Sequence, residues 1–272
     1  MRRLLSAVLA LALLGGWAGR AGEAKLSPLL VCPAPVAEWR ADIQNVQHVL
    51  TSAARELWRF FPERTLPPII VAPKGGPIVW FQRGINGEYF IQLDTGGSYW
   101  SQYAYQFAHE FCHVLCNYTG DEKSNKWLEE SICEVASLFA LRGMAATWAK
   151  TPPYPNWRDF APNHRKYADD RLASSKLPPE TTFVEWFRQN EAAMRKDACI
   201  REKNNVVAAA LLPLFEKQPE HWEAVTWLNA QPSRAPRTLA EHLTAWRSSC
   251  PPKHRPFVAE LARVFGISLP AE

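Results

Sequence analysis

The segment Ala108-His109-Glu110-Phe111-Cys112-His113 places two histidines four residues apart, with a glutamate directly after the first. Residues 100–118 around it are predicted to form a helix, in which residues four apart lie about 40° apart around the axis and about 6 Å apart along it. The two imidazoles therefore leave one face and are positioned to bind a single zinc ion. Glu110 projects from the flank of that face, where it can reach a water held on the metal without being a ligand.

A second predicted helix, residues 127–148, supplies the missing ligand. A catalytic zinc site has three protein ligands and one open position. Glu130 follows His113 by 17 residues, enough for one tight turn and an antiparallel return, so it is predicted to be the third ligand. Glu134 lies four residues further on the same face, where it can accept the free ring N–H of a ligand histidine and orient it. Glu129 is predicted to be only a favourable charge near the helix N-terminus.

Three alternatives apply to these residues. The alternative for the two histidines is that they are hydrogen-bonded side chains on a buried helix face. Glu130 and Glu134 are explained by the helix dipole. Cys112 and Cys116 share the stripe of the histidines, which allows a structural Cys/His zinc site, although such a site gives Glu110 and Glu130 no role.

Upstream of the motif, the pattern predicts one helix and a small sheet. Apolar residues recur at helical spacing over residues 41–61. Three β-like runs follow at residues 68–71, 78–82 and 88–94, and the last two flank Gly84-Ile85-Asn86-Gly87, which is typical of a hairpin turn. Ser98 is the predicted N-terminal cap of the motif helix.

Downstream of the second helix, residues 151–163 form a Pro-rich aromatic stretch that predicts an ordered loop. Further helices are predicted at residues 182–196, 200–217, 221–230, 239–248 and 256–265. The fold class is therefore predicted as α+β. A small, mostly antiparallel sheet with an N-terminal helix packs on the two motif helices, and an all-helical part follows. We expect a catalytic lobe at residues 25–150 and a helical lobe at residues 151–272, together forming one globular unit.

The N-terminus predicts export. Met1-Arg2-Arg3 is basic, residues 4–14 carry no charge, and small residues follow, which is the pattern of a secretory signal peptide over residues 1–24. The apolar run is too short for an ordinary membrane span, so an uncleaved anchor is the lesser alternative. The mature chain is expected to be periplasmic or extracellular, without a stable membrane span.

Composition narrows the class of protein further. The chain has 272 residues, of which 47% are hydrophobic and 21% charged, as in a globular protein with a sizeable core. The formal charge of +4 gives no support for a nucleic-acid partner. Six cysteines in an exported chain favour disulfides, with Cys199 pairing Cys250 and Cys133 pairing Cys112 or Cys116. The alternative is that the cysteines are reduced and buried.

At these residues the sequence resembles the gluzincin zinc metallopeptidases (HExxH…E, peptidase-MA-like). Trp127-Leu128-Glu129-Glu130-Ser131 looks like that family's Trp-Leu-x-Glu-Gly/Ser entry to the glutamate helix. The order of sheet, zinc helix and glutamate helix over residues 66–150 is also similar. The resemblance implies that the last strand of the sheet, residues 88–94, binds the substrate backbone. It also implies that a downstream Tyr or His holds the tetrahedral intermediate, for which the candidates are Tyr154, His164, Tyr167 and His221.

The function predicted from the motif and this resemblance is peptide-bond hydrolysis by an exported zinc metallopeptidase. One zinc ion per chain is bound by His109, His113 and Glu130, and Glu110 acts as general base on the zinc-bound water. The Gly-x-Met-Glu-Asn segment of the related aminopeptidases is absent, so an endopeptidase is favoured. The alternatives are a gluzincin-like fold that has lost hydrolysis and serves as an extracytoplasmic binding module, or an exported helical scaffold. Substrate-binding residues and oligomeric state stay open.

Overall fold

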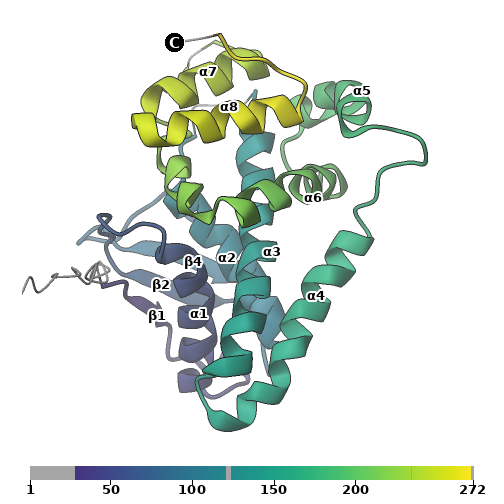
Figure 1. The fold of residues 1–272 in the computed structure, drawn as a ribbon. Coiled ribbons are helices and arrows are strands. Elements are labelled where there is room, and N and C mark those ends of the chain that lie inside the picture. The colour runs from purple at the N-terminus through teal and green to yellow at the C-terminus, as the bar shows by residue number, and fades with distance from the viewer. Residues whose placement is uncertain (1–27, 121–123, 234, 271–272) are drawn as a thin grey trace, which may run out of the picture.

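The computed structural model describes residues 28–120, 124–233 and 235–270. The predicted signal peptide, residues 1–24, lies outside these residues. The chain is α+β, as predicted, with a four-stranded sheet and a larger helical part. Figure 1 shows the sheet on one side of the central helix α3, helix α4 along its other side, and helices α5 to α8 grouped at the top of the view.

The N-terminal part contains the sheet and the two motif helices. Its elements are β1 (Val31–Pro33), a 3-10 turn (Ala37–Trp39), α1 (Ile43–Trp58), β2 (Ile69–Pro73), β3 (Ile78–Val79), β4 (Tyr89–Leu93), α2 (Trp100–Leu115) and α3 (Lys126–Lys150). The predicted cap of α2 is wrong, because the capping position is Tyr99 and Ser98 lies before it.

The sheet is mostly parallel, which corrects the predicted antiparallel arrangement. Its strand order is β1-β2-β4-β3, and only the β3–β4 pair is antiparallel. The difference arises because Val31–Pro33 is a strand too short to recognise from its pattern, and α1 forms the crossover that returns the chain parallel to it. The predicted hairpin is present, with Gly84 N donating to Glu88 O at 3.0 Å.

The position of β4 corrects a second expectation. β4 lies between β2 and β3 and is hydrogen-bonded on both sides. It therefore has no free edge to offer a substrate backbone, contrary to what the resemblance implied for residues 88–94. The edge of the sheet on this side is β3.

Helix α3 organises the core. It packs against α1, α2, α4 and α6, and its residues are buried on nearly all sides. A helix that is apolar all round is typical of such a central position. By length and composition α3 is also the one helix of the described residues that qualifies to cross a membrane, but 67% of its most apolar stretch is buried inside the fold.

The C-terminal part is helical, as predicted, with two differences. Its elements are a 3-10 turn (Pro155–Phe160), α4 (Ala161–Ala173), α5 (Phe183–Lys196), α6 (Arg201–Lys217), a 3-10 segment (Pro219–Trp227), α7 (Leu239–Ser249), a 3-10 turn (Pro252–His254) and α8 (Arg255–Val264). Helix α4 is not predicted from the sequence, because most of its residues are exposed or half-buried and show no clear apolar stripe. The predicted helix at residues 221–230 is instead the 3-10 segment.

Candidate metal centre

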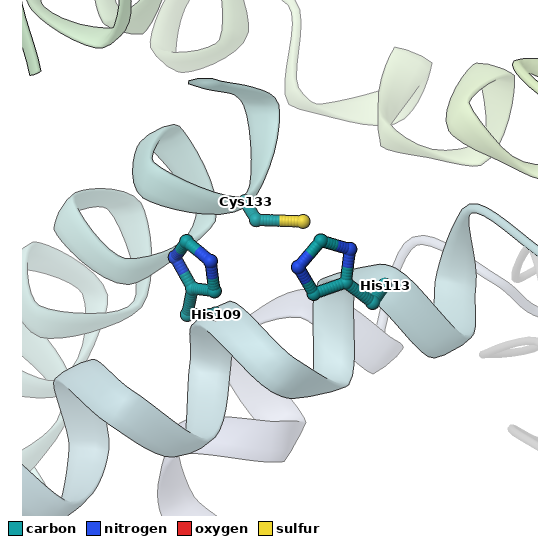
Figure 2. Close-up of side chains that lie close together, drawn as sticks. All are labelled: His109, His113 and Cys133. Carbon is teal, nitrogen blue, oxygen red and sulfur yellow. The ribbon is translucent and has the colours of Figure 1, made fainter. Parts of the chain in front are cut away.

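The two motif histidines lie on one face of α2, as their spacing requires. Their ring centroids are 5.2 Å apart, and the rings are inclined by 70°. His113 is buried and His109 is partly exposed to the cleft described below. Figure 2 shows both imidazoles rising from α2 toward α3, with Cys133 of α3 opposite them.

The two ring nitrogens of each histidine have different partners. His109 Nδ1 lies 3.5 Å from Glu134 Oε2, and His113 Nδ1 lies 2.5 Å from Glu129 Oε1. These contacts fix both rings so that their Nε2 atoms face a single oxygen of Glu130. The distance from Glu130 Oε2 is 3.3 Å to His109 Nε2 and 3.5 Å to His113 Nε2.

This arrangement fits a zinc ion. Zinc binds imidazole nitrogen and carboxylate oxygen at about 2.0–2.1 Å, and two such ligands on a tetrahedron are about 3.3 Å apart. The separations of 3.3 and 3.5 Å match that edge without rearrangement of the backbone. His109, His113 and Glu130, the three residues predicted as ligands, are therefore brought together, with one Glu130 oxygen close to an Nε2 atom of each histidine.

Glu110 occupies the flank of the histidine face. Its carboxylate is buried, with 5% of the residue exposed, yet it lines the cleft. Among the described residues, no hydrogen bond or ion pair engages it. A buried carboxylate without a protein partner is available to exchange a proton with water or a substrate.

Glu134 is held on three sides. Tyr105 Oη donates to Glu134 Oε1. The Asn205 amide, oriented so that its nitrogen faces two acceptors, also donates to Glu134 Oε1 at 2.9 Å. A carboxylate fixed in this way orients His109 through its Nδ1, as predicted from the sequence.

Glu129 corrects a sequence expectation. Glu129 does lie in the first turn of α3, but it is not only a favourable charge there, because it is 3% exposed and hydrogen-bonded to His113. Lys126 Nζ donates to its Oε1 at 2.5 Å, and Asn229 Nδ2 donates to its Oε2 at 2.8 Å. Asn229 comes from the C-terminal part, so residues distant in sequence support the site. Helical spacing alone does not place Glu129 beside His113, and the adjacency of Glu129 to Glu130 is the one hint that the sequence offers.

The carboxylates dominate the electrostatics of the two histidines. Burial lowers the pKa of His109, but Glu130 and Glu134 outweigh burial and raise the pKa to about 10. Burial likewise lowers the pKa of His113, but Glu129 and Glu130 raise it to about 9. For Glu130, burial raises the pKa, and the two imidazoles together hold it well below its usual value. The site thus attracts positive charge strongly.

The site opens into a cleft of about 1040 Å³. One wall carries His109, Glu110 and Glu130. Another is the sheet edge at residues 77–82, and a third is formed by side chains of α4 and α6, among them Arg171 and Arg201. A cleft of this size accommodates several residues of a peptide.

Only Tyr167 of the four candidates for oxyanion stabilisation lines the cleft. The other three candidates do not line the cleft, because their side chains are engaged elsewhere. Tyr154 packs edge-on against His48, His164 Nδ1 lies 3.0 Å from Ser101 Oγ in the core, and His221 Nδ1 lies 2.9 Å from His254 Nδ1. Tyr167 Oη accepts a hydrogen bond from Arg171 Nη2 at 3.0 Å.

The cysteines depart from the predicted disulfides. All six carry free thiols in the structure, and Cys112, Cys116, Cys133 and Cys250 are buried. Cys112 Sγ and Cys116 Sγ are 3.9 Å apart, and Cys133 Sγ completes a group of three sulfurs within 4.8 Å of one another. Cys133 Sγ also lies within 4.8 Å of a ring nitrogen of His109 and of His113 (Figure 2). The predicted closeness of Cys133 to Cys112 and Cys116 is present without a bond between them, whereas the closeness of Cys133 to the two histidines is not predicted from the sequence.

Comparisons of the chain with protein-family models, with curated proteins and with solved structures find no match.

Proposed function

We propose that the protein is an exported zinc-dependent metallopeptidase that hydrolyses peptide bonds, and that it is an endopeptidase. The observation that carries the proposal is the contact of one Glu130 oxygen with the Nε2 atoms of both His109 and His113. Three ligand atoms with the open cleft beside them suit a catalytic rather than a closed structural zinc site.

The zinc ligands in this proposal are His109, His113 and Glu130. Zinc bound there supplies a Lewis acid that acidifies water and polarises a carbonyl oxygen. Glu134 and Glu129 hold the two imidazoles in the required orientation through their Nδ1 atoms.

Glu110 is the general base and then the general acid. Its carboxylate takes a proton from the attacking water and passes that proton to the nitrogen of the leaving amine. Its lack of a hydrogen-bond partner among the described residues supports this role. Tyr167 is the candidate hydroxyl for the developing oxyanion, because it lines the cleft, and Arg171 donates to its oxygen and leaves its own O–H to donate, whereas the hydroxyls of Tyr105 and Tyr118 already donate to Glu134 and Trp80 O.

The substrate lies along β3 in this proposal. Strand β3 is an edge of the sheet, and residues 77–82 line the cleft. An extended peptide can add to such an edge through main-chain hydrogen bonds. This places the backbone-binding strand one position further out than the resemblance implied.

The test combines metal analysis with a proteolysis screen of the purified protein. We expect about one zinc per chain and cleavage of peptides that a chelator stops and zinc restores. Glu110→Gln should retain zinc and lower cleavage by about 100-fold or more. Glu202→Gln, which changes an exposed carboxylate on α6, serves as the matched control. Zinc without cleavage of any peptide would favour the binding-module alternative, and absence of zinc would exclude the metal centre.

A further inference from the structure

Cys133 is the buried nucleophile of the centre that the proposed function does not use. It lies on α3, three residues after Glu130, and its side chain points from that helix toward the two imidazoles (Figure 2). Its Sγ and one ring nitrogen of each histidine lie within 4.8 Å of one another. Sulfur and nitrogen bound to one tetrahedral zinc are about 3.6 Å apart, from bond lengths of about 2.3 and 2.1 Å.

The thiol is therefore within a side-chain adjustment on the order of 1 Å of a metal at the His–His–Glu centre. Its other neighbours are the sulfurs of Cys112 and Cys116. A thiol is a weak hydrogen-bond donor and acceptor, so these contacts restrain Cys133 little. Cys133 is the one cysteine that belongs to both groups: the three neighbouring thiols and the cluster with the two histidines.

We propose that Cys133 is a fourth protein ligand of the metal centre and competes with water for the open coordination position. The inference rests on the proposed metal centre. A sulfur–metal bond forms, the thiol proton passes to solvent, and water is displaced from the metal. Two anionic ligands, Glu130 and Cys133, then cancel the charge of a divalent ion in this buried site. Hydrolysis needs the water, so the thiolate-bound form binds metal without turnover.

A ligand set that includes the Cys133 thiolate differs in its chemistry from a centre made of His109, His113 and Glu130 alone. Two imidazoles, a carboxylate and a thiolate bind soft divalent ions better than two imidazoles and a carboxylate do. Cobalt(II) makes the difference visible, because a cobalt–thiolate bond has a charge-transfer absorption in the near ultraviolet that nitrogen and oxygen ligands lack.

The experiment titrates cobalt(II) into the reduced, chelator-treated protein under inert gas. We expect one cobalt per chain and the thiolate charge-transfer band in the wild-type protein. The band should disappear in Cys133→Ser and Cys133→Ala, while the visible bands of a bound cobalt remain. Cys112→Ser is the matched control, because Cys112 belongs to the thiol group but not to the histidine cluster, and it should keep the band.

The outcomes separate this inference from the proposed function. One cobalt per chain without a charge-transfer band in the wild-type protein overturns the role of Cys133 and leaves the His–His–Glu centre intact. Persistence of the band in both Cys133 variants overturns it as well. Failure of the wild-type protein to bind cobalt overturns both. If the wild-type protein shows the band and the Cys133 variants do not, zinc-loaded Cys133→Ala should also hydrolyse peptide several-fold faster than zinc-loaded wild type.

Discussion

Glu129 and Glu130 contact opposite nitrogens of the same imidazole. Glu129 Oε1 lies 2.5 Å from His113 Nδ1, and Glu130 Oε2 lies 3.5 Å from His113 Nε2. Two adjacent residues of α3 therefore have different roles at one ring. Glu129 orients the imidazole of His113, and Glu130 is, with His113, a ligand of the proposed metal. The arrangement requires the start of α3 to cross directly over His113.

Glu129→Gln should weaken zinc binding by about 10- to 100-fold, the usual effect of losing a carboxylate that orients a ligand histidine. The amide keeps the shape of the side chain but removes its charge. Competition with a chromophoric chelator measures the affinity. Glu220→Gln, an exposed glutamate of the segment Pro219–Trp227, is the control. Unchanged affinity in Glu129→Gln would refute the orienting role.

Asn229→Ala tests whether the C-terminal part supports the centre. Asn229 Nδ2 donates to Glu129 Oε2 at 2.8 Å and to Cys116 O at 3.0 Å. Its removal should lower the zinc affinity in the same direction as Glu129→Gln, but by less, because Lys126 still contacts Glu129. The double variant measures the coupling. Strict additivity of the two effects would show that Asn229 acts independently of Glu129.

The stability of the chelator-treated protein should fall as the pH rises from about 6.5 toward 10. The carboxylates raise the pKa of His109 to about 10 and of His113 to about 9 in the folded state, above the value of about 6.5 for an unperturbed histidine. A raised folded-state pKa stabilises the fold fully below the unfolded pKa, and this contribution is lost as pH rises through the folded one.

Urea unfolding of chelator-treated protein at intervals across that pH range measures this loss. A free energy of unfolding that stays constant or rises from pH 6.5 to 10 would contradict the predicted protonation of the two histidines. The Glu130→Gln variant should show a shallower decline, because Glu130 contributes to both pKa shifts.

Arg64 stabilises the C-terminal end of the motif helix. Its guanidinium donates to Leu115 O at 2.5 Å and to Val114 O at 2.9 Å, two carbonyls of the last turn of α2, and Val114 O also accepts from Asn117 N at 3.2 Å. Arg64→Met should lower the free energy of unfolding by about 1–3 kcal/mol, since Leu115 O loses its side-chain donor and Val114 O loses one of its donors. Arg55→Met, on exposed α1 surface, should change it little. Equal stability of the two variants in urea would rule out the capping role.

Tyr167→Phe should lower kcat by about 100-fold or more if its hydroxyl holds the oxyanion, with KM nearly unchanged. Tyr154→Phe provides the matched control, because Tyr154 does not line the cleft. Steady-state kinetics on one cleaved peptide would separate kcat from KM. A loss confined to KM would assign Tyr167 to substrate binding instead.

Helical periodicity could predict the histidine face and the placement of Glu130 and Glu134, because residues four apart on a helix share a face wherever that helix packs. It could not place Glu129 beside His113. Adjacent helix residues point about 100° apart, and which of them is buried depends on the angle at which α3 crosses α2. Asn229 and Cys133 depend on the same packing.

The sheet shows that a very short strand cannot be recognised from the alternation of its residues. A strand of three residues, Val31–Pro33, carries too few positions for a recognisable alternation, so the sequence does not reveal the crossover through α1 and predicts a mostly antiparallel sheet in place of the mostly parallel one. The same holds for Tyr154, His164 and His221, because their neighbours are set by long-range packing rather than by local pattern.

The central claim is a zinc ion bound by one oxygen and two Nε2 atoms between α2 and α3. Diffraction from crystals of the zinc-loaded protein, recorded on both sides of the zinc absorption edge, tests it most directly. We expect one anomalous peak about 2.0–2.2 Å from His109 Nε2, His113 Nε2 and a Glu130 oxygen. A zinc ion held elsewhere, or a peak that contacts the histidines but leaves Glu130 beyond bonding distance, would contradict it.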